Sequence, residues 1–137
     1  MYSLVEVLSN KLNINPLHLM ILINFETGGT FNPKIKSQVS SAQGLVQFLD
    51  LTSSTLVDKF GNKVNNTSEL IQKYPTIKAQ LDVPNDENKF GGPVYQYLSK
   101  LKPKKDDLRD LIACNFYPKA REVDGYKFKK HIRNKNG

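Results

Sequence analysis

Glu26 is the side chain in this sequence that is best placed to do acid chemistry. It follows the apolar segment 17–25 and precedes Gly28 and Gly29, which commonly end helices because glycine readily adopts the left-handed conformation. The negative end of the helix dipole and apolar surroundings both favour the protonated form of a carboxyl group there. Such a group can act as a general acid, for example toward a glycosidic oxygen. The alternative is a Glu that turns outward at the frayed end of a helix.

The helix that would carry this acid is predicted to span residues 16–26. Asn15 is a favoured N-cap residue, and Pro16 at the first helical position gives up no hydrogen bond. Apolar side chains then surround the helix, so we expect it to run through the interior. An amphipathic helix over 3–12 is expected to pack on it.

Gln47 is the second candidate, and it is reached through a polar loop over 30–43. A neutral amide donates and accepts hydrogen bonds without titrating, so Gln47 suits the task of orienting a substrate or the Glu26 carboxyl. The small polar residues before Gly44 would let a ligand approach the backbone. Taken alone, a Gln on a short surface helix is an equally good interpretation.

Three blocks of this sequence together resemble the lytic transglycosylase, or lysozyme-like, superfamily. They are Glu26-Thr27-Gly28-Gly29, then Gly44-Leu45-Val46-Gln47-Phe48 after a loop with Asn32-Pro33, and later Ala113-Cys114-Asn115. The similarity runs from about Leu17 to Tyr117 and is closest to the small virion-associated transglycosylases of tailed bacteriophages. It implies a mainly α, lysozyme-like fold of the goose-type or soluble lytic transglycosylase kind, with at most a small β-hairpin, and it makes Glu26 the catalytic acid.

The chain departs from the family pattern at three positions. Thr27 replaces a Ser and keeps the hydroxyl, and Val46 replaces a Met and keeps the apolar character. Cys114 stands where other members have Tyr, so either Tyr117 or a Tyr from another helix would take that place. By the resemblance, the substrate-binding residues are Thr27, Ser41, Gln47, Tyr95, Tyr97, Asn115 and Tyr117. Tyr95 and Tyr97 cannot both face one way on a helix, so one is expected to line the groove and the other to pack.

The implied reaction is cleavage of the β-1,4 bond between N-acetylmuramic acid and N-acetylglucosamine in peptidoglycan. Retaining and inverting glycosidases use a second carboxylate, but Asp50, Asp58 and the acids of 82–87 have ready explanations as caps, solvent-exposed groups or loop residues. This absence favours the route that the resemblance implies, in which the N-acetyl group of the substrate assists, the sugar's own 6-hydroxyl attacks, and the product is a 1,6-anhydro sugar. A hydrolytic muramidase is the nearest alternative, followed by a non-catalytic glycan-binding virion module and a structural virion protein.

The remaining helices are predicted from caps and spacing. One is expected from residue 49 to Phe60 with Leu51, Thr55, Leu56 and Phe60 on its inner side. Others are expected after Asn66, over 76–81, after Pro93, and after Asp106 or Asp107. The 137 residues are predicted to form one domain, in which 119–137 is a basic C-terminal tail.

Composition narrows the class of partner. The formal net charge of +7 suits a polyanion such as wall polymer, whereas nucleic acid is not expected because aromatic and basic residues do not alternate. The longest apolar run, 17–25, is too short to span a membrane, and the first residues do not form a signal peptide. His18 and His131 lie far apart and Cys114 is single, so no metal or cofactor is expected. The resemblance points to a virion protein, with other virion or tail proteins as further partners, that acts in the host cell wall or periplasm.

Overall fold

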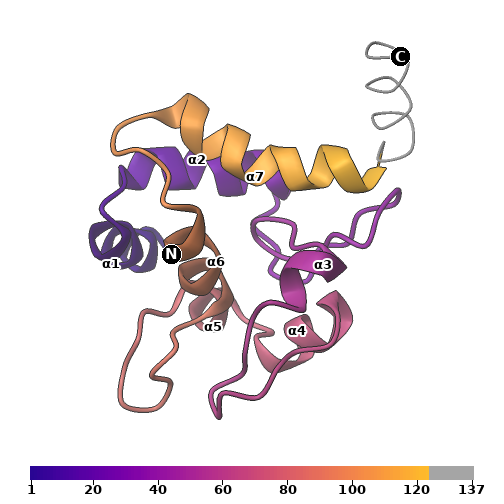
Figure 1. Cartoon of the computed structure of the whole chain (residues 1–137). Coiled ribbons are helices and arrows are strands. Elements are labelled where there is room, and N and C mark those ends of the chain that lie inside the picture. The colour runs from indigo at the N-terminus through magenta and orange to yellow at the C-terminus, as the bar shows by residue number, and fades with distance from the viewer. Residues whose placement is uncertain (124–137) are drawn as a thin grey trace, which may run out of the picture.

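The computed structural model describes residues 1–123, with side chains described as far as Tyr117, and this part of the chain is mainly helical (Figure 1). Isolated antiparallel bridges, such as Lys36 with Gln43, take the place of named strands in it. The predicted mainly α class is therefore confirmed. The seven helices are α1 (Tyr2–Leu12), α2 (Pro16–Glu26), α3 (Asp50–Ser53), α4 (Thr67–Lys73), α5 (Ile77–Leu81), α6 (Pro93–Leu101) and α7 (Leu108–Val123).

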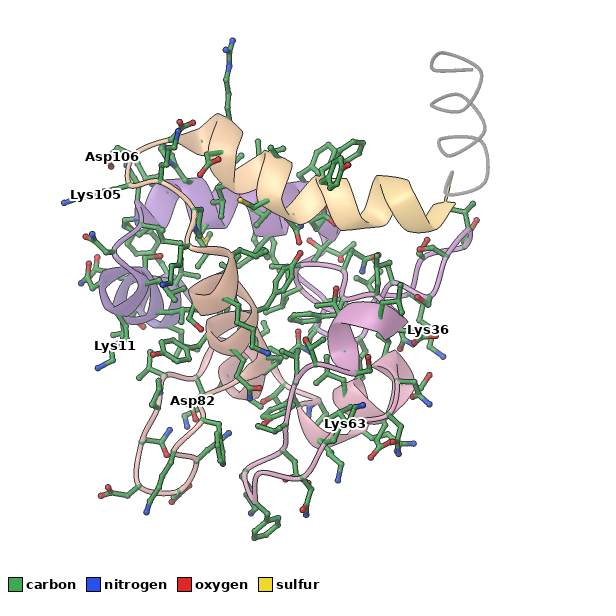
Figure 2. The ribbon with its side chains drawn as sticks, in the orientation of Figure 1. Lys11, Lys36, Lys63, Asp82, Lys105 and Asp106 are labelled. Carbon is green, nitrogen blue, oxygen red and sulfur yellow. The ribbon has the colours of Figure 1, made fainter. Side chains whose placement is uncertain are left out.

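Helices α2 and α7 pack together along one side of the molecule, and α1 packs against α2 (Figure 1). The shorter helices α3 to α6 lie on the other side of this pair, with α5 against both α6 and α1. Side chains fill the space between the ribbons (Figure 2). The core joins Leu8 of α1, Leu22 of α2, Leu98 of α6 and Leu111 of α7, which are all buried.

Helix α2 begins and ends where the sequence predicted. The Asn15 side chain accepts a hydrogen bond from Leu17 N at 2.9 Å, and Gly28 and Gly29 follow the helix with positive φ. The expectation that this helix is buried on all sides is wrong. Leu17, Ile21 and Phe25 share one face and are 59%, 46% and 71% exposed, because α1 and α7 cover other sides of the helix.

The helix predicted over 49–60 is also wrong, since α3 ends at Ser53. The Ser54 and Thr55 hydroxyls donate to backbone carbonyls three residues earlier, at 2.8 and 2.7 Å. Such side chains compete with the helical hydrogen-bond pattern. Of the side chains expected to face inward, Leu56 is buried, whereas Leu51 and Phe60 are about three-quarters exposed.

Helix α7 is longer than the sequence indicated. Asp107 is its N-cap residue, because its Oδ1 accepts from Asp110 N at 2.9 Å. The helix continues to Val123, so the first residues of the predicted basic tail are helical, and residues 124–137 lie outside the described residues. In the described part of the chain, every helix is too short or too polar to cross a membrane.

Candidate active site

Glu26 is the last residue of α2 and is half-buried. The next residue, Thr27, is completely buried, and its hydroxyl donates to Ile23 O at 2.8 Å and accepts from Phe31 N at 3.0 Å. It therefore fixes the path of the chain out of the helix. The prediction that Thr27 binds substrate is corrected, because its side chain is enclosed by protein.

Gln47 lies in a tight turn, the one between Gln43 and Phe48. Gln43 and Phe48 exchange two backbone hydrogen bonds of 3.0 and 2.7 Å, and Gly44 makes the turn with φ 94°. Gln47 Nε2 donates to Ile35 O at 3.1 Å and to Gly44 O at 3.0 Å. Both amide hydrogens therefore hold the loop together, and the donor function predicted for substrate is already used inside the protein.

Tyr97 of α6 connects this turn to Glu26. Its ring packs edge-on against the Phe48 ring, with centroids 5.9 Å apart. Burial raises the pKa of the Tyr97 hydroxyl, and the nearby charges of Cys114 and Glu26 raise it further. The hydroxyl thus keeps its proton and remains a hydrogen-bond donor beside the acid.

Tyr95 faces a different part of the molecule. It lines an open hollow with Lys11 and Asn13 at the end of α1. The two tyrosines of α6 diverge as expected, and Tyr97, which is near Glu26, packs in the core at 7% exposure. That one of the two lines a substrate groove stays a prediction. Tyr95 is corrected from a residue of this site to a residue of the α1 side.

Asn115 of α7 is buried next to the same turn. Its Nδ2 donates to Val46 O at 3.2 Å, whereas its Oδ1 has no hydrogen-bond partner within the described residues. Buried acceptors are nearly always satisfied, so this atom is an exception among the described residues, which it shares with Ser9 Oγ of α1. Asn115 therefore offers an acceptor close to the backbone of the turn.

Ser41 and Tyr117 are the two remaining residues that were predicted to bind substrate. Ser41 is half-buried, and its hydroxyl accepts from Asp50 N at 3.0 Å, so it supports the start of α3. Tyr117 is 54% exposed near the outer side of α7.

The sequence analysis did not identify Gln80 of α5, whose side chain holds the Gly44–Phe48 turn in place. Its side chain accepts from Leu45 N at 3.0 Å and donates to Pro33 O and Tyr74 O at 2.6 and 3.0 Å. This buried amide ties both ends of the polar loop to one helix. No signal in the sequence distinguishes it from an exposed Gln in a short helix.

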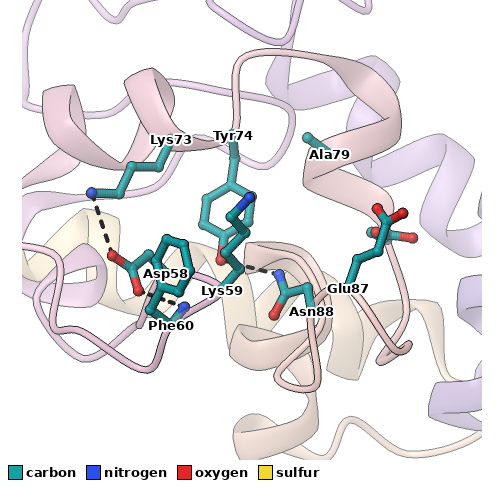
Figure 3. A pocket seen from close by; sticks show the side chains of 9 residues that line it. Asp58, Lys59, Phe60, Lys73, Tyr74, Ala79, Glu87 and Asn88 are labelled. Carbon is teal, nitrogen blue, oxygen red and sulfur yellow. Dashed lines mark hydrogen bonds and ion pairs between the residues drawn. The ribbon is translucent and has the colours of Figure 1, made fainter.

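A second carboxylate and tyrosine meet at the opposite end of the molecule, in an open hollow of about 320 Å³ (Figure 3). Asp58 pairs with Lys73 at 3.4 Å, and its Oδ1 accepts from the backbone of Phe60 and Asn62, both at 2.9 Å. Burial alone would raise the pKa of Asp58, but these backbone donors and Lys73 outweigh it and hold the pKa below the usual 3.8. Asp58 thus stabilises a loop.

Glu26 does not line any of the four hollows described in the structure. No protein-family model, curated protein or solved structure matches this chain. Within the described residues, His, Cys, Asp and Glu form no group of three that could hold a metal ion.

Proposed function

We propose that this protein is a peptidoglycan lytic transglycosylase that cleaves the N-acetylmuramic acid to N-acetylglucosamine bond with Glu26 as general acid and base. The observation that supports this most directly is the meeting of Glu26, Tyr97 and Asn115 around the Gly44–Phe48 turn. These residues lie on three helices that are distant in sequence, with Glu26 at the end of α2, Tyr97 within α6 and Asn115 within α7. Protonation of a glycosidic oxygen needs a positioned general acid, and in this proposal the phenol and the amide oxygen orient the substrate beside it.

In the proposed mechanism, Glu26 gives its proton to the glycosidic oxygen as the bond from that oxygen to the anomeric carbon breaks. The 6-hydroxyl oxygen of the same muramic acid residue then bonds to the anomeric carbon, and its proton passes to Glu26. The acid is thereby regenerated and the product is a 1,6-anhydro sugar. The Tyr97 hydroxyl would donate toward the reacting oxygens, and Asn115 Oδ1 would accept from a substrate hydroxyl or amide.

Two of the other carboxylates considered from the sequence, Asp50 and Asp58, have structural tasks. Asp50 accepts from Thr67 N at 2.9 Å, and Asp58 is held by Lys73 and two backbone amides. This supports a route in which the sugar supplies its own nucleophile, because hydrolysis by a carboxylate pair needs a second group facing the acid. We further propose that the enzyme is carried by a phage particle and opens the wall locally during infection.

The test is digestion of purified sacculi with the wild type, Glu26→Gln and the control Glu6→Gln, followed by mass spectrometry of the released muropeptides. Glu6 is an exposed residue of α1, so its substitution removes the same carboxyl group away from the site. We expect anhydro-muropeptides from the wild type and the control and none from Glu26→Gln. Products that are heavier by one water would show that the enzyme is a hydrolytic muramidase and not a transglycosylase.

Cosedimentation with sacculi separates catalysis from binding. An enzyme with the proposed acid should still bind sacculi after Glu26→Gln, since the amide keeps the size of the side chain. A wild type that binds sacculi and releases no muropeptide would be a binding module, and one that does neither would contradict both readings.

A further inference from the structure

A second hollow, of about 340 Å³, lies between the end of α1 and the chain that follows α6. Lys11, Lys102 and Lys105 line it, and no carboxylate is part of the lining. Figure 2 shows Lys11 and Lys105 on the same side of the molecule, although they come from segments far apart in the sequence. The fold has therefore gathered three cations around one concave surface.

These ammonium groups are not used in ion pairs. Within the described residues, the one ion pair joins Lys73 to Asp58. The neighbouring Lys100 differs, because its Nζ donates to Thr55 O at 2.7 Å. Asp106, next to Lys105 in sequence, is outside the lining and accepts from Asn15 Nδ2 at 3.4 Å. The positive charge of the hollow is thus left for a ligand or for solvent.

Helix dipoles explain only part of this arrangement. Lys11 lies in the last turn of α1 and Lys102 is the C-cap residue of α6, where a cation interacts favourably with the negative end of a helix. Two helix ends carry a partial charge of about −1 together, against three positive charges. Lys105 precedes α7, and a cation gains nothing from the positive end of a helix.

We propose that this hollow binds the phosphate group of a small phosphate ester, such as a phosphorylated sugar or polyol. Lysine binds phosphate as a point charge, and three lysines match a dianion better than they match a single carboxylate. Asn13 and Tyr95 add an amide and a phenol to the lining, while Leu12 and Leu98 give it an apolar part. A volume of about 340 Å³ leaves room for an organic group beside the phosphate. The site is separate from Glu26, so it stands or falls independently of the proposed reaction.

The test is titration of the full chain with glycerol phosphate at constant ionic strength, followed by amide NMR, with acetate as the monovalent comparison. We expect saturable shifts confined to residues 11–13 and 102–105. The Lys11→Gln/Lys105→Gln double variant should lose affinity by about tenfold or more, equivalent to about 1.4 kcal/mol. The control Lys36→Gln/Lys63→Gln removes the same charge from other parts of the surface (Figure 2) and should bind within about twofold of the wild type.

Equal losses in both double variants would mean that glycerol phosphate responds to net charge alone, and this would overturn the proposal. A lower melting temperature of the Lys11/Lys105 variant with unchanged binding would also overturn it, because the lysines would then serve only the helix ends. Vesicles of phosphatidylglycerol identify the source of the phosphate. Vesicle binding that glycerol phosphate displaces and the double variant loses would assign it to a lipid headgroup, and binding of the free ester alone would assign it to a soluble ligand.

Discussion

The molecule contains two pairs of a carboxylate and a tyrosine, Glu26 with Tyr97 and Asp58 with Tyr74. In both pairs burial is the largest cause of the raised tyrosine pKa, and the charge of the carboxylate adds to it. Each pair also lies near a buried amide, Asn115 in the first case and Asn88 in the second. On proximity alone, either pair would qualify as an acid site.

The two pairs differ in how their hydrogen bonds are used. The Tyr74 hydroxyl donates to Val57 O at 2.8 Å, and Asn88 bonds Tyr74, Gly91 and Phe90. Asp58 closes its own loop in the same way. The hydrogen bonds of this pair therefore stabilise the fold, even though both residues line a hollow.

Asn115, near the Glu26 pair, keeps an acceptor that no described residue uses. Asn115 Oδ1 is buried without a partner in the described residues, and the Tyr97 hydroxyl keeps its proton. Leaving a buried acceptor open costs about 1–3 kcal/mol. The proposed function uses this open acceptor beside a half-buried carboxylate, whereas the Asp58 pair lines a hollow without such an acceptor among the described residues.

Replacing each carboxylate by its amide should show the largest difference between the two pairs, because one change should affect the cleavage rate and the other the free energy of unfolding. We expect Glu26→Gln to lower the rate of glycan cleavage by about 10²–10⁴-fold, since the proton donor is lost, and to leave the melting temperature unchanged. Asp58→Asn should lower the free energy of unfolding by about 2 kcal/mol, because the ion pair with Lys73 is lost from a buried position, while the folded enzyme stays active. Denaturant unfolding and sacculus turbidity measure the two effects. The comparison fails if both variants lose activity to the same extent.

Removing the tyrosine hydroxyl of each pair should show the same difference between activity and stability, with smaller effects. Tyr97→Phe should reduce cleavage by about tenfold, since about 1.4 kcal/mol of transition-state stabilisation corresponds to that factor, with the fold intact. Tyr74→Phe should instead cost about 1 kcal/mol of stability, because Val57 O and Asn88 each lose a partner. The same two assays apply to both variants. An unchanged rate in Tyr97→Phe would remove the phenol from the mechanism.

Local signals in the sequence predict where α2 begins and ends and where α4 begins. Asn15 and Asn66 were recognised as caps, and the structure gives both side chains a hydrogen bond to a backbone amide. Gly28 and Gly29 marked the end of α2 correctly. These features depend only on neighbouring residues, which is why a single sequence reveals them.

Features that depend on distant contacts were predicted less well. The apolar face of Leu17 and Phe25 gives no sign of being exposed, because that follows from where α1 and α7 pack. The choice between Tyr95 and Tyr97 depends on the rotation of α6 against its neighbours, which spacing alone leaves open. Thr27 has the residue type of a ligand contact, yet its burial follows from the path of the loop after α2.

Acid titration should give the smallest effect and the most specific one. The pKa of Asp58 is lower in the folded protein than its usual 3.8, so the unfolded chain binds this proton more readily. Asp58 therefore stabilises the fold above about pH 4, and that contribution is lost as the pH falls through the lowered folded-state pKa. We expect the stability gap between wild type and Asp58→Asn to narrow from about pH 6 to about pH 3 in denaturant unfolding. The exposed Asp86→Asn serves as the control, and a gap that stays constant over this range would show that the ionised Asp58 does not stabilise its loop.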